Sequence, residues 1–335
     1  MRFALLFWLV TLFPSSFSKP ALKPFHIFGF TQGTSYQVTY YAEDNVVSKL
    51  DVELILSEID SSLSIYKPYS LLSRFNQSAS GLQADEHLKR VVKKSLEISQ
   101  KTGGAFDISV QPLVQAWGFG TKPVAATPDS AAVLLLLKCV GLGKVTLHRN
   151  QLRKFAPCVR IDVNGIAQGY TVDVLADYLE KQGIRNYLVE IGGEIRVKGR
   201  KQPGGALMSI GIEGPDKNKP AIFPIQKVIR LENGAITASG NYRKFYQSGN
   251  KTISHLIDPK AGFPVQNELI SVTVWAKNAL TADGYDNALM GMGLDKALKF
   301  LGMQKCMEAY FIYHTPDGSI ADTATTGFYK LMDKR

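Results

Sequence analysis

The stretch ITASGNYRKFYQSGNKTISHLIDPKAGFP, residues 236–264, is the part of the sequence around which the rest is organised. It combines hydroxyl side chains, one His, one Asp and three glycines, and it carries a turn signal at Gly249–Asn250. Such a mixture makes a poor core, because buried polar groups need hydrogen-bond partners. Glycine instead lets a ligand approach the backbone closely. The stretch therefore predicts a region shaped around a polar, phosphate-bearing ligand.

Composition places the chain among ordinary globular proteins. Of its 335 residues, 45% are hydrophobic and 20% are charged, which is enough to bury a sizeable core. The net charge of +10 suits a nucleic acid, an anionic membrane or an anionic small ligand. The sequence contains no nucleic-acid-binding motif, so we expect no nucleic-acid partner.

The first residues, MRFALLFWLVTLFPSSFSKP, have a basic start, a short apolar run and small residues before Lys19. This pattern is typical of a secretory signal peptide. We expect a signal peptide over residues 1–18 and a single mature domain over 19–335. An uncleaved anchor is the alternative, but the apolar run is short for a membrane span. No cysteine is present there to take a lipid, so the mature protein is expected to be exported, most simply to the periplasm, and soluble without stable membrane insertion.

Three cysteines, Cys139, Cys158 and Cys306, lack the spacing of a metal site. An odd number allows at most one disulfide. We expect buried, unpaired thiols.

The N-terminal half alternates between strand and helix signals. We expect a single strand over Phe25–Tyr40, broken at Gly29 and Gly33, and then a helix capped at Asp44. Residues 62–77 are rich in hydroxyls and predict a loop that carries Tyr66, either toward a site or simply on the surface. A helix over Ala84–Thr102 ends at a Gly pair, and Asp107 after it is expected to organise a loop.

The C-terminal half shows the same mixture. We expect a helix capped at Thr127, a hairpin turning near Asn150, and then a strand, helix and strand over residues 161–199. Later segments predict a strand over 270–276, helices over 280–293 and 295–301, and a hairpin at Asp317–Gly318. The whole pattern favours an α+β fold.

Two sets of residues suggest chemistry. Glycines at 165, 169, 192 and 193 lie beside the predicted helix start, where backbone N–H groups can bind a phosphate, although they form neither a dinucleotide fingerprint nor a P-loop. Asp283 and Asn287 are four residues apart on one helix face, where two oxygen ligands can hold Mg²⁺. The alternative is a capping Asp and a surface Asn. His255 is the one His in a polar motif and can position a phosphate or move a proton.

Four stretches read together resemble the ApbE-type FAD:protein FMN transferase family. They are IDVNGIAQGYTVD, YLVEIGGEIRVKG, ITASGNYRKFY with SHLIDPKAGFP, and TADGYDNALMGMG. Three supporting pieces, FTQGTSYQV, IYKPYSLLSRFN and GGAFDISVQPLVQAWGFG, follow the order that the family uses. The resemblance extends from about Phe28 to Phe328.

The resemblance implies a two-lobed, T-fold-like α+β domain with mixed, largely antiparallel sheets, flanking helices and FAD in the cleft between the lobes. It implies a Mg²⁺-dependent transfer of FMN from FAD to a threonine hydroxyl of an exported domain of a membrane redox protein, with release of AMP. The physical logic agrees, because phosphoryl-type transfer depends mainly on positioning and charge neutralisation.

The resemblance also implies roles for single residues. The metal ligands would be Asp283, Asn287 and the carbonyl of Ala167, and the catalytic residues would be His255 and Asp283. The FAD-binding residues would be Gly33, Thr34, Tyr66, Asp162, Gly165, Glu190, Gly192, Gly193, Ser239, Gly240 and His255.

The chain departs from the family pattern at four positions. Asn287 stands where the family usually has Thr, Gln168 where it has Lys, Gln32 where it has Met, and Ala261 where it has Thr. These departures bear on metal affinity and rate. They leave two alternatives open, an FAD pyrophosphatase that gives FMN to water and a non-catalytic flavin-binding protein.

Overall fold

The computed structural model describes residues 21–215, 224–241, 245–248 and 251–332. The predicted signal peptide over residues 1–18 and the predicted turn at Gly249–Asn250 lie outside these described residues. Within them, no helix has both the length and the apolar character that a membrane crossing requires.

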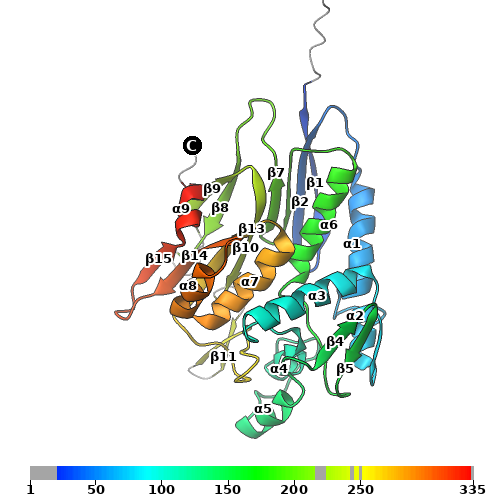
Figure 1. Cartoon of the computed structure of the whole chain (residues 1–335), viewed down its shortest axis with the longest axis vertical. Helices are drawn as coiled ribbons and strands as arrows, with labels where there is room; N and C mark the ends of the chain where they lie inside the picture. The colour runs from blue at the N-terminus through cyan, green and yellow to red at the C-terminus, as the bar shows by residue number, and fades with distance from the viewer. Residues whose placement is uncertain (1–20, 216–223, 242–244, 249–250, 333–335) are drawn as a thin grey trace, which may run out of the picture.

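A large antiparallel sheet forms the centre of the molecule (Figure 1). Within the described residues it has eight strands in the order β1-β2-β6-β7-β10-β13-β14-β15, and each neighbouring pair is antiparallel. The strands are β1 (Lys23–Thr31), β2 (Thr34–Ala42), β6 (Tyr187–Ile191), β7 (Glu194–Lys198), β10 (Asn233–Gly240), β13 (Leu269–Ala276), β14 (Met307–His314) and β15 (Ile320–Ala324).

Helices cover one face of this sheet. Their apolar sides form two clusters, one between the first strands and the helices α1 and α6, the other among α3, α7, α8 and the later strands. The helices are α1 (Lys49–Leu63), α3 (Glu86–Lys101), α6 (Ala167–Lys181), α7 (Ala279–Met292) and α8 (Leu294–Gly302). The opposite face packs a third cluster against the hairpin β8 (Met208–Glu213) and β9 (Ile225–Leu231) and the helix α9 (Thr326–Met332).

Smaller elements gather beyond one end of the sheet, at the bottom of Figure 1. Some of them share an apolar cluster around Trp117, Val133 and Ile257. Others contribute side chains such as Phe75 and Leu152 to the cluster of α3 and α7. The elements are α2 (Leu71–Gln77), β3 (Gly81–Gln83), a 3₁₀ turn over Ile108–Val110, α4 (Gln111–Ala116), α5 (Ser130–Leu137), β4 (Val145–His148), β5 (Gln151–Lys154), β11 (Phe245–Ser248) and β12 (Lys251–Ser254).

The α+β class is confirmed, and so are most helices. The predicted segments 84–102, 280–293 and 295–301 correspond to α3, α7 and α8, and residues 270–276 lie in β13. The hairpins near Asn150 and at Asp317–Gly318 are also present. Asp107 is a loop organiser, because its carboxylate accepts hydrogen bonds from the backbone and hydroxyl of Ser109 and from the hydroxyl of Ser99.

Two predicted strands are wrong because each is a hairpin. Residues 25–40 turn at Gln32–Gly33, where both residues have positive φ (51° and 77°), as a tight two-residue hairpin turn requires. Residues 187–198 turn in the same way at Gly192–Gly193. Alternating side chains continue across such short turns, so the pattern alone reads as one strand.

Local corrections concern caps and one strand. The first helix is capped by Ser48, whose hydroxyl and backbone exchange hydrogen bonds with Asp51, and not by Asp44. Asp129, not Thr127, caps α5. The predicted loop 62–77 contains the helix α2, which Ser70 caps. Residues 161–166, predicted as a strand, pair with no strand and form a loop before α6.

The expectation of buried, unpaired cysteines is wrong. Cys139 and Cys158 form a disulfide, and Cys306 is a free, exposed thiol. The two bonded residues are 19 positions apart, with the β4–β5 hairpin between them. The bridge therefore ties the end of α5 to the loop that leads toward Asp162.

We expect the double substitution Cys139→Ser and Cys158→Ser to destabilise the protein by about 3 kcal/mol. Without the bridge, the unfolded chain is no longer held in a closed loop and its conformational entropy rises. Thermal unfolding of the oxidised wild type and of this variant measures the difference. A Cys306→Ser variant is the control and should unfold like the wild type. Equal stability of all three proteins would contradict a stabilising role for the bridge.

Candidate functional site

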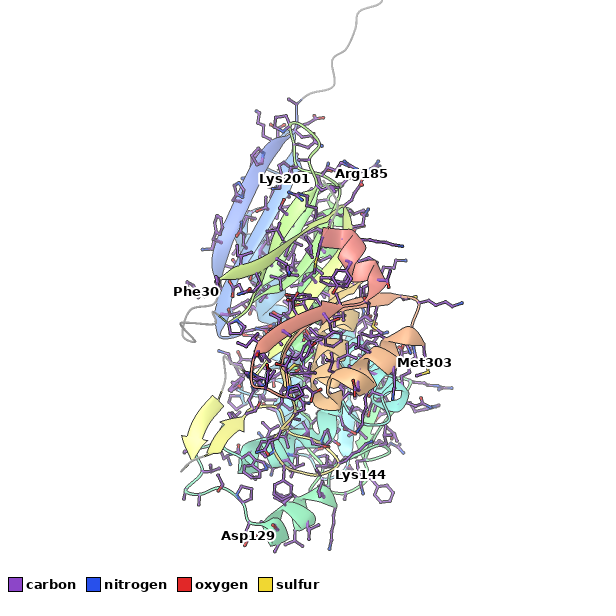
Figure 2. The ribbon with its side chains drawn as sticks, turned by 90° about the vertical axis from the view of Figure 1, so that its left-hand side faces the viewer. Phe30, Asp129, Lys144, Arg185, Lys201 and Met303 are labelled. Atoms are coloured by element: carbon purple, nitrogen blue, oxygen red, sulfur yellow. A yellow bond between two sulfur atoms is a disulfide. The ribbon has the colours of Figure 1, made fainter. Side chains whose placement is uncertain are left out.

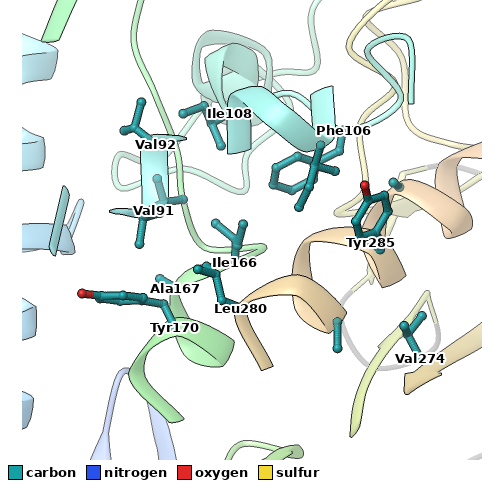
Figure 3. Close-up of a cluster of buried hydrophobic side chains, with 14 of the residues drawn as sticks. Val91, Val92, Phe106, Ile108, Ile166, Ala167, Tyr170, Val274, Leu280 and Tyr285 are labelled. Carbon is teal, nitrogen blue, oxygen red and sulfur yellow. The ribbon is translucent and has the colours of Figure 1, made fainter. Parts of the chain in front are cut away.

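The N-terminus of α6 lies directly against α7, and a glycine makes this approach possible. A Cβ at Gly169 would come within 2.4 Å of the Ala279 carbonyl oxygen and 2.7 Å of the Asp283 side chain. The Gly169 N–H donates to Asp283 Oδ2 over 2.8 Å. Asp283 therefore places a carboxylate at a helix N-terminus, where the helix dipole favours negative charge. Figure 3 shows the apolar floor of this junction, with Ile166 and Ala167 of the α6 start beside Leu280 of α7.

Asn287, one turn further along α7, draws three segments together. Its Nδ2 donates to the Gly165 carbonyl oxygen (3.2 Å), to the Asp283 carbonyl oxygen (3.1 Å) and to Asp286 Oδ1 (2.8 Å). Its Oδ1 accepts from the Ser239 hydroxyl over 3.1 Å. The structure thus joins Gly165, Ser239 and α7 in one contact network.

The carbonyl oxygen of Ala167 ends a chain of two hydrogen bonds. The Thr171 hydroxyl donates to this oxygen over 2.7 Å, and Gln32 Nε2 donates to the Thr171 hydroxyl over 2.7 Å. Since the Gln32 amide nitrogen is a donor only, the single Thr171 proton must point to Ala167. The sequence did not reveal this chain, because Gln32 and Thr171 are 139 residues apart.

Buried carboxylates give the site its electrostatic character. Burial, together with the nearby charge of Asp173, raises the pKa of Asp283 to about 7. Burial and the charges of Asp283 and Glu194 hold the pKa of Asp286 well above its ordinary value. Burial makes it costly to ionise these two carboxyl groups, and a bound cation would offset that cost.

The donor set fits a hard cation such as Mg²⁺. Within the described residues, no group of three or more His, Cys, Asp or Glu side chains is arranged to hold a metal, so a cage made of carboxylates alone is excluded there. Asp283, Asn287 and the Ala167 carbonyl instead offer one carboxylate, one amide and one backbone oxygen, and Mg²⁺ accepts such a set with water or phosphate completing its shell. Sequence reasoning did not assign Asp286 to this cluster. The available clue was an Asp on a helix face that is otherwise apolar, because such a carboxylate is buried when the helix packs.

The two hairpin turns meet beside α6. The Gly192 N–H donates to the Ser35 carbonyl oxygen over 3.2 Å, and a Cβ at Gly192 would come within 2.9 Å of the Thr34 methyl carbon and 3.2 Å of Gln168 Nε2. Glu190 Oε1 accepts from the Gly193 N–H over 2.8 Å, and burial raises the pKa of Glu190. The structure therefore brings Thr34, Glu190, Gly192 and Gly193 together, with Gly33 in the adjoining turn.

A groove of about 460 Å³ is formed by residues of β1, β2 and β6 together with the start of α1, and it includes Glu190. It is lined by Phe28, Gly29, Phe30, Ser35, Tyr36, Gln37, Lys49 and Glu190. Figure 2 shows Phe30 standing out from the edge of the sheet.

Asp162 and Tyr66 are joined through Asn164. The Asn164 backbone N–H donates to Asp162 Oδ1 over 2.8 Å, and its Nδ2 lies 3.4 Å from Asp162 Oδ2 and 3.5 Å from the Tyr66 hydroxyl. Burial of the hydroxyl and the charge of Asp162 raise the pKa of Tyr66. The Tyr66 side chain is nevertheless 62% exposed, so it stands at the rim of the site.

His255 packs against the segment that follows α4. Its ring packs edge-on against Phe119, with centroids 6.3 Å apart. The following turn is held by Asp258, whose carboxylate accepts from the N–H groups of Lys260 and Ala261, and by Trp117, whose indole N–H donates to the Gly262 carbonyl oxygen. Ala261 thus contributes its backbone to this turn. Gly240 ends β10 next to Ser239.

Comparisons with known proteins identify a family to which the chain is similar. A model of the ApbE family matches residues 32–311. The chain is 37% identical over 291 residues to the FAD:protein FMN transferase of Vibrio cholerae serotype O1, covering 83% of this chain and 85% of the relative. It is 36% identical over 275 residues to the FAD:protein FMN transferase of Haemophilus influenzae, covering 78% and 79%.

Solved structures are similar as well. The flavin transferase ApbE from Vibrio cholerae superposes with a TM-score of 0.83 at 34% identity, covering 92% of this chain and 99% of that one. The apo form of the Pseudomonas stutzeri flavinyl transferase ApbE gives a TM-score of 0.83 at 30% identity, covering 94% and 98%.

The raised pKa of Asp283 makes the stability of the metal-free protein depend on pH. The folded-state pKa of about 7 lies above the ordinary 3.8, so the contribution of Asp283 is fully present at low pH and is lost as pH rises from about 4 to about 7. We expect Tm to fall between pH 5 and pH 8 more steeply in the metal-free wild type than in Asp283→Asn, which cannot titrate. Identical slopes in differential scanning fluorimetry would contradict this assignment.

The Thr171 hydroxyl should matter for metal binding. Thr171→Val removes the donor that orients the Ala167 carbonyl, and we expect a 10- to 100-fold loss of Mg²⁺ affinity, the usual cost of removing a partner that orients a metal ligand. Calorimetric titration with Mg²⁺, or Mn²⁺ binding followed by paramagnetic resonance, measures the affinity. Thr171→Ser keeps the hydroxyl and should restore binding, whereas wild-type affinity in the Val variant would refute the role.

Proposed function

The chain belongs to the ApbE family and is an FAD:protein FMN transferase. We propose that its activity depends on Mg²⁺ and that it transfers FMN to a threonine hydroxyl of an exported redox-protein domain. The observation that carries this proposal is the buried Asp283 carboxylate at the N-terminus of α6, next to Asn287 and the Ala167 carbonyl. Mg²⁺ bound there would neutralise the pyrophosphate charge and stabilise the charge that develops during transfer.

The reaction exchanges one bond to phosphorus for another. The acceptor oxygen forms a bond to the FMN phosphorus, the bond between that phosphorus and the bridging oxygen breaks, and AMP leaves with the bridging oxygen. The acceptor hydroxyl gives up its proton. His255 is our candidate proton acceptor, because an imidazole is well suited to proton transfer near neutral pH.

The protein's own groups would position the substrate. The Ser239–Gly240 end of β10 lies beside Asn287 and is proposed to face the pyrophosphate. The paired turns at Gly33–Thr34 and Gly192–Gly193, with Glu190 and Asp162, are proposed to bind the rest of FAD. FAD would thus lie in a cleft between the large sheet and the elements around α4, which gives the two-lobed, T-fold-like arrangement.

Export to the periplasm is part of the proposal. Its support is the signal-like start of the sequence together with the Cys139–Cys158 disulfide, because stable disulfides are typical of oxidising compartments. The acceptors would then be exported domains of membrane redox proteins.

Hydrolysis of FAD to FMN and AMP is the second candidate activity. The exposed Tyr66 favours it, since a side chain at the rim leaves the flavin end of the site open to water. Release of FMN without an acceptor, at a rate comparable to that of transfer, would establish hydrolysis.

Incubation of the mature protein with FAD, Mg²⁺ and a panel of exported flavin-acceptor domains should yield acceptor heavier by the mass of FMN, together with AMP. Intact-mass spectrometry measures the label, and chromatography measures AMP. Acceptor that remains unlabelled across the panel, although the enzyme is folded, would refute the proposed acceptor class.

Asp283→Ala should abolish transfer and leave the fold intact, because it removes the carboxylate proposed to hold Mg²⁺. Asp295→Ala, an exposed carboxylate on α8, is the matched control and should retain full activity. Circular dichroism verifies folding of both variants. Normal transfer by Asp283→Ala would remove this residue from the catalytic site.

A further inference from the structure

We propose that the end of the molecule formed by residues 121–160, here called the α5 end, docks on the surface of an anionic lipid membrane. The α5 end comprises α5, the β4–β5 hairpin and their connections. It lies at the bottom of Figure 1, away from the strands that carry Glu190 and Ser239.

Exposed apolar side chains are the first observation. The sequence of α5 is SAAVLLLL, and a short helix at the surface can bury only one side of such a run. Val133 faces the local core with Trp117, while Leu134 and Leu135 remain 66% and 62% exposed. Leu142 and Phe155 nearby are 52% and 81% exposed. These four side chains therefore expose apolar surface to water.

Positive charge is the second observation. Residues 121–160 contain seven Lys or Arg and one Asp, a net charge of +6 within a chain whose total is +10. None of the ion pairs found in the described part of the chain involves a side chain of this segment. Lys154 is buried, and burial together with the charge of Arg160 lowers its pKa to about 8. The other six are at least partly exposed: Lys122, Lys138, Lys144, Arg149, Arg153 and Arg160.

A hydrogen bond, a cation–ring contact and a disulfide tie parts of the α5 end to one another. The Phe155 N–H donates to the Lys144 carbonyl oxygen over 2.9 Å, and the Lys144 ammonium lies 5.7 Å from the centre of the Phe155 ring. The Cys139–Cys158 bridge fixes the end of α5 to the segment after β5. Figure 2 shows Lys144 and Asp129, the cap of α5, at the same end of the molecule.

A lipid surface satisfies both kinds of side chain at once. Lys and Arg gain favourable energy from anionic headgroups, and Leu and Phe enter the boundary between headgroups and hydrocarbon. A nucleic acid would pair with the charges but leave the Leu side chains in water. A protein partner needs a continuous, closely packed apolar centre with few charges, whereas the exposed apolar side chains here belong to a segment with a net charge of +6.

Membrane docking would hold the site beside its acceptors. The apolar cluster under α5 includes Ile257, two residues from His255, so α5 packs together with the region of His255. This consequence rests on the proposed transfer to membrane redox proteins, but docking itself does not. A test of docking therefore uses no FAD and no acceptor.

Cosedimentation of the mature protein with vesicles tests the proposal. We expect binding to vesicles of phosphatidylcholine with one quarter phosphatidylglycerol, weakening at 0.5 M salt, and little binding to pure phosphatidylcholine. Leu134→Ser with Leu135→Ser, and separately Lys138→Glu with Lys144→Glu, should each lower the partition coefficient at least tenfold.

Matched control variants carry the same changes elsewhere. Leu50→Ser with Leu54→Ser alters two exposed leucines of α1, and Lys296→Glu with Lys299→Glu alters two exposed lysines of α8. Both should bind vesicles like the wild type. Thermal unfolding confirms that every variant is folded, and all four should transfer FMN to a soluble acceptor at the wild-type rate.

Three results would overturn the proposal. They are absence of binding to the anionic vesicles, equal losses in the test and control variants, and a change from dimer to monomer in Leu134→Ser with Leu135→Ser without any vesicle binding. The last result, seen by analytical ultracentrifugation, would assign the surface to a second copy of the chain. Since activity on a soluble acceptor is measured separately, failure of docking leaves the proposed transferase mechanism intact.

Discussion

The contact between Gly169 and Asp283 is the constraint on which the candidate site depends. Because residue 169 has no Cβ, α6 and α7 approach closely enough for a backbone N–H to hold the Asp283 carboxylate. That approach sets Asn287 within reach of Gly165 and Ser239, and the Ala167 carbonyl belongs to the same first turn of α6 as Gly169. A larger residue at 169 would separate the helices and with them the oxygen atoms proposed to share a metal.

Local chemistry explains what could be predicted from the sequence. Asp283 and Asn287 were identifiable because a helix places residues four apart on one face, and α3 was recognisable from its apolar spacing and its Gly–Gly end. The resemblance to flavin transferases then indicated which glycines and acids belong together, and the structure brings most of them into contact. Tyr66 at the rim and His255 on the α4 side are connected to this group less directly.

The features that could not be predicted depend on contacts between segments that are distant in the sequence. Strand alternation continues across the turns at Gln32–Gly33 and Gly192–Gly193, so two hairpins resembled single strands. The partner of Cys139 cannot be chosen by spacing among three cysteines. The chain from Gln32 through Thr171 to Ala167 joins a turn to a helix distant in sequence. Such features follow from the antiparallel sheet as a whole.

The order of strands in the sheet has a consequence for biosynthesis. β2 pairs with β6, and β10 lies between β7 and β13, so neighbours in the sheet are made far apart in time. The pairs Gly169–Asp283 and Gly165–Asn287 close across 114 and 122 residues. An incomplete chain therefore has no assembled site until residue 287 has emerged. A nascent polypeptide that ends before α7 therefore cannot assemble the contacts of the candidate site, which form only after the C-terminal third has joined the sheet.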